Sequence, residues 1–220
     1  MVTLYIDDWQ IEAEEGISVL RAALDAEIYI PNLCWVEGMT HPPASCRLCF
    51  VEIEGYSRPV TSCTTTVEEG MVVTTNSEAV REMQRTSLKL LLSVHDVDCG
   101  HCPANKNCAL QDIAKFLKVK LKPKGFPSYE PDLPIDTSHS LIEYNPNRCV
   151  LCGRCIHVCR EKNGSPLLTF TGRGFKTVVN LMGLTGDQES ACAQCLACVD
   201  ICPTGALIRK EEKEEKETGS

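Results

Sequence analysis

The pattern of apolar and polar residues in the first part of the chain predicts short strands around one helix. Two β-rich runs cover residues 2–6 and 9–13, and the polar pair at 7–8 between them predicts a hairpin. A helix is expected next over residues 19–27, because Ser18 suits the N-cap position.

Further strands are expected downstream, at residues 50–53, 59–62 and 71–75. The order of hairpin, helix and then more strands is typical of the β-grasp fold, the arrangement found in plant-type ferredoxins. The sequence therefore predicts an α+β chain whose first domain, residues 1–75, is a β-grasp [2Fe–2S] ferredoxin-like domain.

Two helices are expected in a small second domain over residues 76–120. Asn76 suits the N-cap of the first helix, which should deliver His95 at its end, and the second helix should begin near Asn107. The apolar positions that indicate the first helix are Val80, Met83, Leu88, Leu91 and Leu92. Four prolines within 121–134 indicate a linker, taken as residues 121–139.

The last part of the chain repeats one cysteine pattern. The runs CVLCGRCIHVC and CAQCLACVDIC are separated by 32 residues, which is the layout of a bacterial-type 2[4Fe–4S] ferredoxin domain. We assign it to residues 140–208. The remaining residues, 209–220, alternate in charge and are expected to form a solvated tail.

Fifteen cysteines and one histidine form four sets of four candidate iron–sulfur ligands. The first set predicts a [2Fe–2S] cluster, and the other three sets each predict a [4Fe–4S] cluster. The third and fourth sets each take one cysteine from the other run, because in two-cluster ferredoxins the fourth cysteine of each run binds the other cluster. The sets are Cys34, Cys46, Cys49, Cys63; His95, Cys99, Cys102, Cys108; Cys149, Cys152, Cys155, Cys202; and Cys192, Cys195, Cys198, Cys159.

The second set is distinctive because it mixes one imidazole with three thiolates in the order H-x3-C-x2-C-x5-C. A neutral imidazole in place of a thiolate removes negative charge and should raise the reduction potential. His101 is the alternative nitrogen donor, but it lies inside the loop between Cys99 and Cys102, where reaching the same cluster is awkward. His95 is therefore favoured. His41, His139 and His157 are interpreted as surface or packing residues.

Other uses of the cysteines fit less well. Tight C-x-x-C-x-x-C runs suit neither disulfides nor a structural zinc site, which prefers two separated pairs. The N-terminus shows no signal-peptide pattern and no apolar run approaches the ~20 residues of a bilayer span, so a cytoplasmic protein without a membrane span is expected. A net charge of −8 disfavours nucleic acid as a partner.

No dinucleotide-binding, phosphate-binding or nucleophile–base pattern appears in the sequence, so no catalytic or organic-cofactor residues are predicted. Only 5% of the residues are aromatic. The core should therefore depend on the clusters, and metal removal should unfold the chain.

The order of the four sets resembles a family of iron–sulfur subunits. It comprises the large iron–sulfur subunit of respiratory complex I and the related regions of NAD-linked formate dehydrogenases and iron-only hydrogenases. It also includes the small diaphorase subunit of NAD-reducing nickel–iron hydrogenases. The resemblance covers residues 1–208, and the spacing from His95 to Cys108 is its most specific part. The given sequence ends soon after Cys202, and a chain of this extent is expected to resemble the stand-alone diaphorase subunit.

This resemblance implies an electron-transfer subunit of a soluble NAD(P)-linked hydrogenase, relaying electrons between a hydrogenase centre and a flavin- and NAD-binding subunit. The implied partners are that iron–sulfur flavoprotein and the hydrogenase subunits, with ferredoxin as a further partner in electron-bifurcating members. The alternatives are a formate dehydrogenase or complex I-type subunit, a free multi-cluster ferredoxin, and a metal-stapled scaffold without a redox role.

Overall fold

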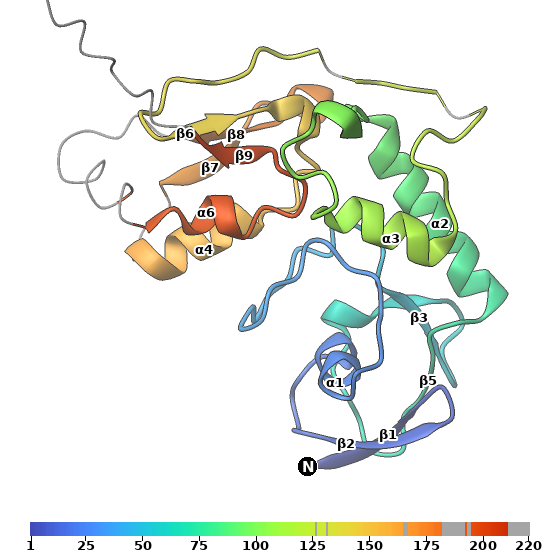
Figure 1. The fold of residues 1–220 in the computed structure, drawn as a ribbon. Coiled ribbons are helices and arrows are strands. Elements are labelled where there is room, and N and C mark those ends of the chain that lie inside the picture. The colour runs from blue at the N-terminus through green and yellow to red at the C-terminus, as the bar shows by residue number, and fades with distance from the viewer. Residues whose placement is uncertain (126, 131, 165–166, 182–191, 193–194, 211–220) are drawn as a thin grey trace, which may run out of the picture.

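The computed structural model describes residues 1–220 apart from 126, 131, 165–166, 182–191, 193–194 and 211–220. Figure 1 shows a strand-rich N-terminal part, two helices beside it, and a C-terminal part with small sheets and helices. This agrees with the predicted α+β class. Among the described residues, no helix has both the length and the apolar character to cross a bilayer.

The N-terminal part is a five-stranded mixed sheet in the order β2-β1-β5-β3-β4. β1 pairs with β2 as the predicted hairpin and runs parallel to β5, while β3 is antiparallel to β5 and β4. The strands are β1 Val2–Ile6, β2 Trp9–Ala13, β3 Phe50–Ile53, β4 Val60–Thr61 and β5 Val72–Thr74.

One helix, α1 (Val19–Asp25), packs on this sheet. Ser18 is its N-cap, as predicted, and the Ser18 side chain accepts a hydrogen bond from the Arg21 N–H. The buried face of α1 carries Val19 and Leu20, which join the apolar side chains of β1, β3 and β5 in one core. The combination of mixed sheet and covering helix is consistent with a β-grasp.

The next two helices are α2 (Glu78–Ser93) and α3 (Ala109–Leu117), which pack against each other. The predicted N-cap Asn76 is wrong. Ser77 caps α2, because its side chain accepts the Val80 N–H at 3.2 Å. α2 ends at Ser93, so His95 lies in the loop just beyond it.

A shared core joins these helices to the N-terminal part. Leu88, Leu92 and Ile113 pack with Leu33 and Leu48, which come from the loops that carry the first cysteine set. The fully buried Gln84 of α2 adds a polar link, because its side-chain amide donates to the Phe50 carbonyl of β3 at 3.1 Å.

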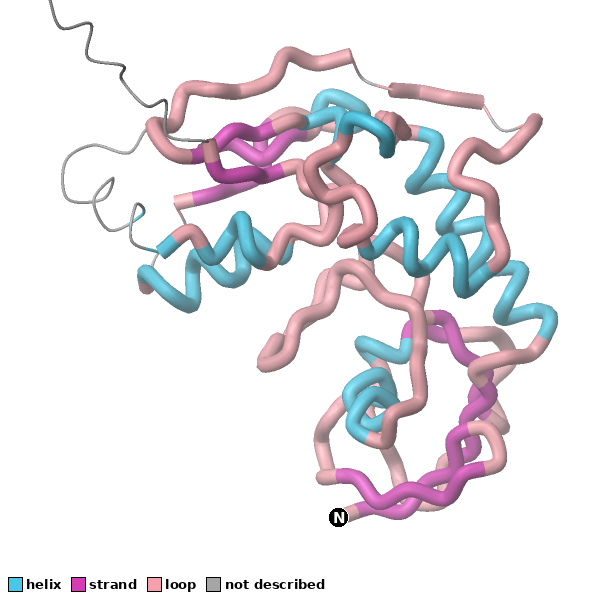
Figure 2. The backbone as a smooth tube through the Cα atoms, in the orientation of Figure 1, coloured by secondary structure: helices cyan, strands magenta, loops and turns pink. Residues whose placement is uncertain are grey.

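The C-terminal part contains two small antiparallel sheets, β6 with β9 and β7 with β8. Helices α4 and α6 pack together, and the described residues of 121–139 cross to β6 as irregular chain, shown in pink in Figure 2. The elements are β6 Ile142–Tyr144, α4 Arg154–Asn163, β7 Leu168–Thr171, β8 Val178–Leu181, α6 Ala197–Asp200 and β9 Leu207–Arg209.

Candidate metal centres

The first cysteine set comes together at the edge of the N-terminal core. Cys34 follows α1, Cys46 and Cys49 precede β3, and Cys63 lies in the short 3-10 turn Ser62–Thr64; all four side chains are buried. The sulfurs of Cys34 and Cys46 are 3.4 Å apart. Hydrogen bonding from Cys46 lowers the pKa of Cys34 to about 5 against the opposing effect of burial.

Cys49 and Cys63 form a second close pair in this set. Hydrogen bonding from Cys63 lowers the pKa of Cys49, although burial opposes this shift. The negative charge of Cys34 acts on Cys49 and Cys63 as well. The structure therefore brings all four side chains of the first set to one place.

The second set surrounds the loop between α2 and α3. Cys99 begins the 3-10 turn Cys99–His101, and Cys108 is the N-cap of α3. Burial raises the pKa of Cys108, and the charges of Cys102 and Cys99 raise it further, so the three thiols are neighbours.

The two candidate histidines of this set have opposite environments. His95 is buried, its Nδ1 has no hydrogen-bond partner within the described structure, and burial lowers its pKa to about 4. The His101 side chain is 86% exposed and pairs with Asp98 at 2.8 Å. A buried neutral imidazole with a free nitrogen is the form that a metal ligand requires. His95 therefore fits as a ligand better than His101 does.

The third set meets around a single cavity in the C-terminal part. Cys149, Cys152, Cys155 and Cys202 all line it. The pKa of Cys152 is raised to about 12, mainly by burial and in part by the charges of Cys149 and Cys202. Cys202 comes from the second cysteine run, and the structure places it at the same cavity as the three cysteines of the first run.

Three members of the fourth set are neighbours in the structure. Burial raises the pKa of Cys198 to about 12, with further contributions from Cys192 and Cys159, the last of which belongs to the first run. Cys195 lies in the same segment beside residues 193 and 194, which are outside the described part. Its membership of the set stays a prediction.

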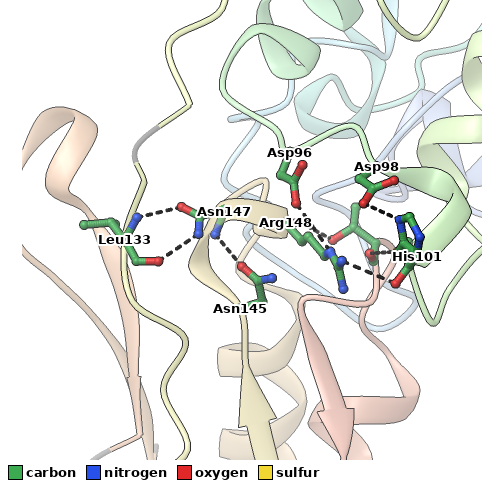
Figure 3. Close-up of polar contacts among 9 residues, drawn as sticks. Asp96, Asp98, His101, Leu133, Asn145, Asn147 and Arg148 are labelled. Atoms are coloured by element: carbon green, nitrogen blue, oxygen red, sulfur yellow. Dashed lines mark hydrogen bonds and ion pairs between the residues drawn. The ribbon is translucent and has the colours of Figure 1, made fainter.

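The second set and the C-terminal part are joined by hydrogen bonds (Figure 3). The Asp96 N–H donates to the Asn147 carbonyl at 2.7 Å, and the Arg148 guanidinium donates to the His101 carbonyl at 3.5 Å. The Arg148 side chain faces Asp96 at 3.8 Å. The segment just before Cys149 is therefore fixed against the loop that carries His95.

Sequence reasoning missed the residues that support the ligands. Asn147 binds the linker through two hydrogen bonds with the backbone of Leu133, at 2.9 and 2.8 Å (Figure 3). Tyr144 lines the cavity of the third set. The sequence feature that could have indicated these two residues is their position shortly before Cys149. Their contacts could not be predicted, because their partners are distant in sequence.

The donor chemistry fits iron–sulfur clusters. Thiolates with an imidazole are ligands that such clusters take, and His95, whose Nδ1 has no hydrogen-bond partner among the described residues, would supply the imidazole. No three described His, Cys, Asp or Glu side chains lie close enough to share one metal ion. This finding is compatible with a four-iron cluster, because each of its four protein ligands binds a different iron atom.

Three families match successive parts of the chain. They are described as "2Fe-2S iron-sulfur cluster binding domain" for residues 1–78, "NADH-ubiquinone oxidoreductase-G iron-sulfur binding region" for 84–122, and "NADH-quinone oxidoreductase subunit 3, ferredoxin-like domain" for 139–208. A chain of the crystal structure of NAD+-reducing [NiFe]-hydrogenase in the H2-reduced state is 32% identical. The match covers 100% of this chain and 90% of that chain, with a TM-score of 0.80.

The chain belongs to the iron–sulfur subunit family shared by NAD(P)-linked hydrogenases and complex I. Curated relatives include the NADPH-Fe(3+) oxidoreductase subunit alpha of Geobacter sulfurreducens, 36% identical over 97% of this chain and 24% of that protein. Another is the NADP-reducing hydrogenase subunit HndD of Solidesulfovibrio fructosivorans, 35% identical over 96% of this chain and 36% of that protein. The chain thus spans about a quarter to a third of these relatives.

Proposed function

We propose that this chain carries electrons through one [2Fe–2S] and three [4Fe–4S] clusters bound by the four ligand sets, within an NAD(P)-linked hydrogenase complex. When bound, clusters of these types accept and release single electrons. The observation that carries the proposal is the convergence of cysteines from both C-terminal runs on one cavity, because separate zinc fingers would not need such crossing.

The protein's own residues would hold the sets in a fixed succession. The first and second sets share the apolar core around Leu33, Leu48 and Ile113. The second and third sets are joined by the contacts of Asn147 with Asp96 and of Arg148 with Asp96 and His101. Burial of the thiols would keep water from the bound clusters, which is one of the factors that set their potentials.

The assignment to a hydrogenase complex is supported by the near full-length similarity to a chain of NAD+-reducing [NiFe]-hydrogenase. The proposed partners are a flavin- and NAD-binding subunit and the hydrogenase subunits. The domain boundaries at 75, 120, 139 and 208 and the cytoplasmic location are part of the same proposal.

A second candidate is the iron–sulfur region of another complex of this family. It is favoured by the 36% identity to NADPH-Fe(3+) oxidoreductase subunit alpha and by the 30% identity to the NADH-ubiquinone oxidoreductase 75 kDa subunit of Reclinomonas americana. The hydrogenase proposal predicts nickel in the purified complex because the similar structure is an NAD+-reducing [NiFe]-hydrogenase. The second candidate predicts no nickel, so metal analysis distinguishes the two.

The test is affinity purification of the tagged chain from its native cells under anaerobic conditions, with metal and flavin analysis of everything retained. Nickel together with flavin supports the hydrogenase proposal. Molybdenum or tungsten would move the assignment to a formate dehydrogenase. A 24.3 kDa monomer that retains no partner and serves many reductases would instead indicate a free ferredoxin.

A further inference from the structure

Tyr144 is a buried tyrosine beside the third ligand set. It ends strand β6, is only 2% exposed, and lines the same cavity as Cys149, Cys152, Cys155 and Cys202. A tyrosine buried this deeply normally needs a partner for its hydroxyl. The groups around the Tyr144 hydroxyl therefore indicate the role of this side chain.

The Tyr144 hydroxyl has one backbone partner and shares its cavity with a candidate ligand thiol. Its oxygen accepts a hydrogen bond from the Val179 N–H of β8 at 3.1 Å. Tyr144 and Cys149 also line the same cavity, and the tyrosine side chain lowers the pKa of Cys149 against the larger, opposing effect of burial. A phenol has a single O–H donor. Since the oxygen already accepts from Val179, the proton is available to the Cys149 sulfur.

We propose that Tyr144 is a positioning residue that donates a hydrogen bond to the Cys149 thiolate and thereby raises the reduction potential of the cluster bound by the third set. The inference rests on the proposed function. Reduction adds negative charge to a cluster and its thiolates, so a donor stabilises the reduced form more than the oxidised form. Val179 fixes the hydroxyl in place because its backbone belongs to the β7–β8 sheet.

The fourth set has a different kind of donor, which makes the effect specific to one centre. The amide of Asn163 lies 3.7 Å from the Cys159 sulfur and 3.0 Å from the Cys159 carbonyl. Cys149 also receives the Leu151 N–H at 3.4 Å, and a Tyr144 variant leaves that backbone donor unchanged. Removing the Tyr144 hydroxyl should therefore alter one centre and spare its neighbour.

The test is an anaerobic potentiometric titration of the full-length, iron-loaded protein, monitored by EPR. Tyr144→Phe should shift the reduction equilibrium of one four-iron centre about tenfold toward the oxidised form, which is about 59 mV for a one-electron couple. The other centres should keep their potentials. The matched control is Tyr129→Phe, which removes the hydroxyl of a tyrosine that is 55% exposed and should shift nothing.

A second variant covers the case in which Tyr144→Phe does not fold, since it leaves the Val179 N–H without its partner. Site-specific 3-fluorotyrosine at position 144 retains the ring and makes the hydroxyl a stronger donor, so the potential should rise. The proposed role of Tyr144 is overturned if the iron-loaded Tyr144→Phe protein keeps the wild-type potentials. It is also overturned if Tyr144→Phe and the 3-fluorotyrosine variant shift the potential in the same direction. Wild-type protein without iron overturns the proposed function itself.

Discussion

Gly205 lies where the C-terminal part meets the loop of the second ligand set, and adding a methyl group there should loosen that contact. A Cβ on Gly205 would stand 2.6 Å from the Ala104 Cβ, and Gly205 has φ +67°. Gly205→Ala therefore combines two costs. A left-handed alanine costs about 1–2 kcal/mol, and overpacking costs about 1–3 kcal/mol, which together give about 2–5 kcal/mol.

Gly164→Ala is the matched control. Gly164 has a similar φ of +69°, but no atom of the described residues lies within 4 Å of the added methyl position. It should therefore lose only the ~1–2 kcal/mol of backbone strain. Combining Gly205→Ala with Ala104→Gly removes the clashing atom and should restore most of the overpacking share.

Scanning calorimetry of the iron-loaded protein measures these differences. For a chain of this size 1 kcal/mol corresponds to roughly 2–4 °C in Tm. Gly205→Ala should therefore lower the transition of the docked parts by roughly 5–15 °C, and Gly164→Ala by a few degrees. Equal losses of Tm in Gly205→Ala and Gly164→Ala would contradict a close approach of Gly205 to Ala104. The same conclusion would follow if the double variant recovered none of the lost Tm.

Three further predictions concern the ligand sets and their supports. His95→Cys should lower the potential of its cluster by on the order of 100 mV because it adds a thiolate charge, whereas His101→Ala should leave that EPR signal unchanged; the reverse pattern would make His101 the ligand. Asn147→Leu loses two hydrogen bonds to the Leu133 backbone and should cost about 1–3 kcal/mol, seen as a lower denaturation midpoint, and an unchanged midpoint would make this contact dispensable. Iron chelation should abolish cooperative unfolding in the C-terminal part, and a sharp transition in the apoprotein would contradict it.

The sequence predicts the N-terminal fold well because its signals are local. The hairpin of β1 and β2 depends on an alternating run and a polar turn, and Ser18 caps the helix that follows directly. The error at Asn76 has a physical reason. Asn76 and Ser77 both suit an N-cap, and the choice depends on the helix phase that buries Val80 and Leu88, which only the packed core decides.

Candidate ligand sets could be proposed from the sequence because cluster chemistry restricts spacing within one loop. The supporting residues could not, because their contacts are long-range. Tyr144 meets Val179 across 35 positions, and Thr204 meets Arg148 across 56. Nothing local distinguishes these side chains from others of their type. The hydrogen bond from the buried Gln84 amide to the Phe50 carbonyl could not be predicted for the same reason.

Quantification of iron and acid-labile sulfide in anaerobically purified protein, with Mössbauer spectra of the same sample, tests the central claim most directly. One two-iron and three four-iron centres predict about fourteen iron atoms per chain, all in cluster environments. Stoichiometric zinc, or a metal-free protein that keeps its fold, would contradict the account.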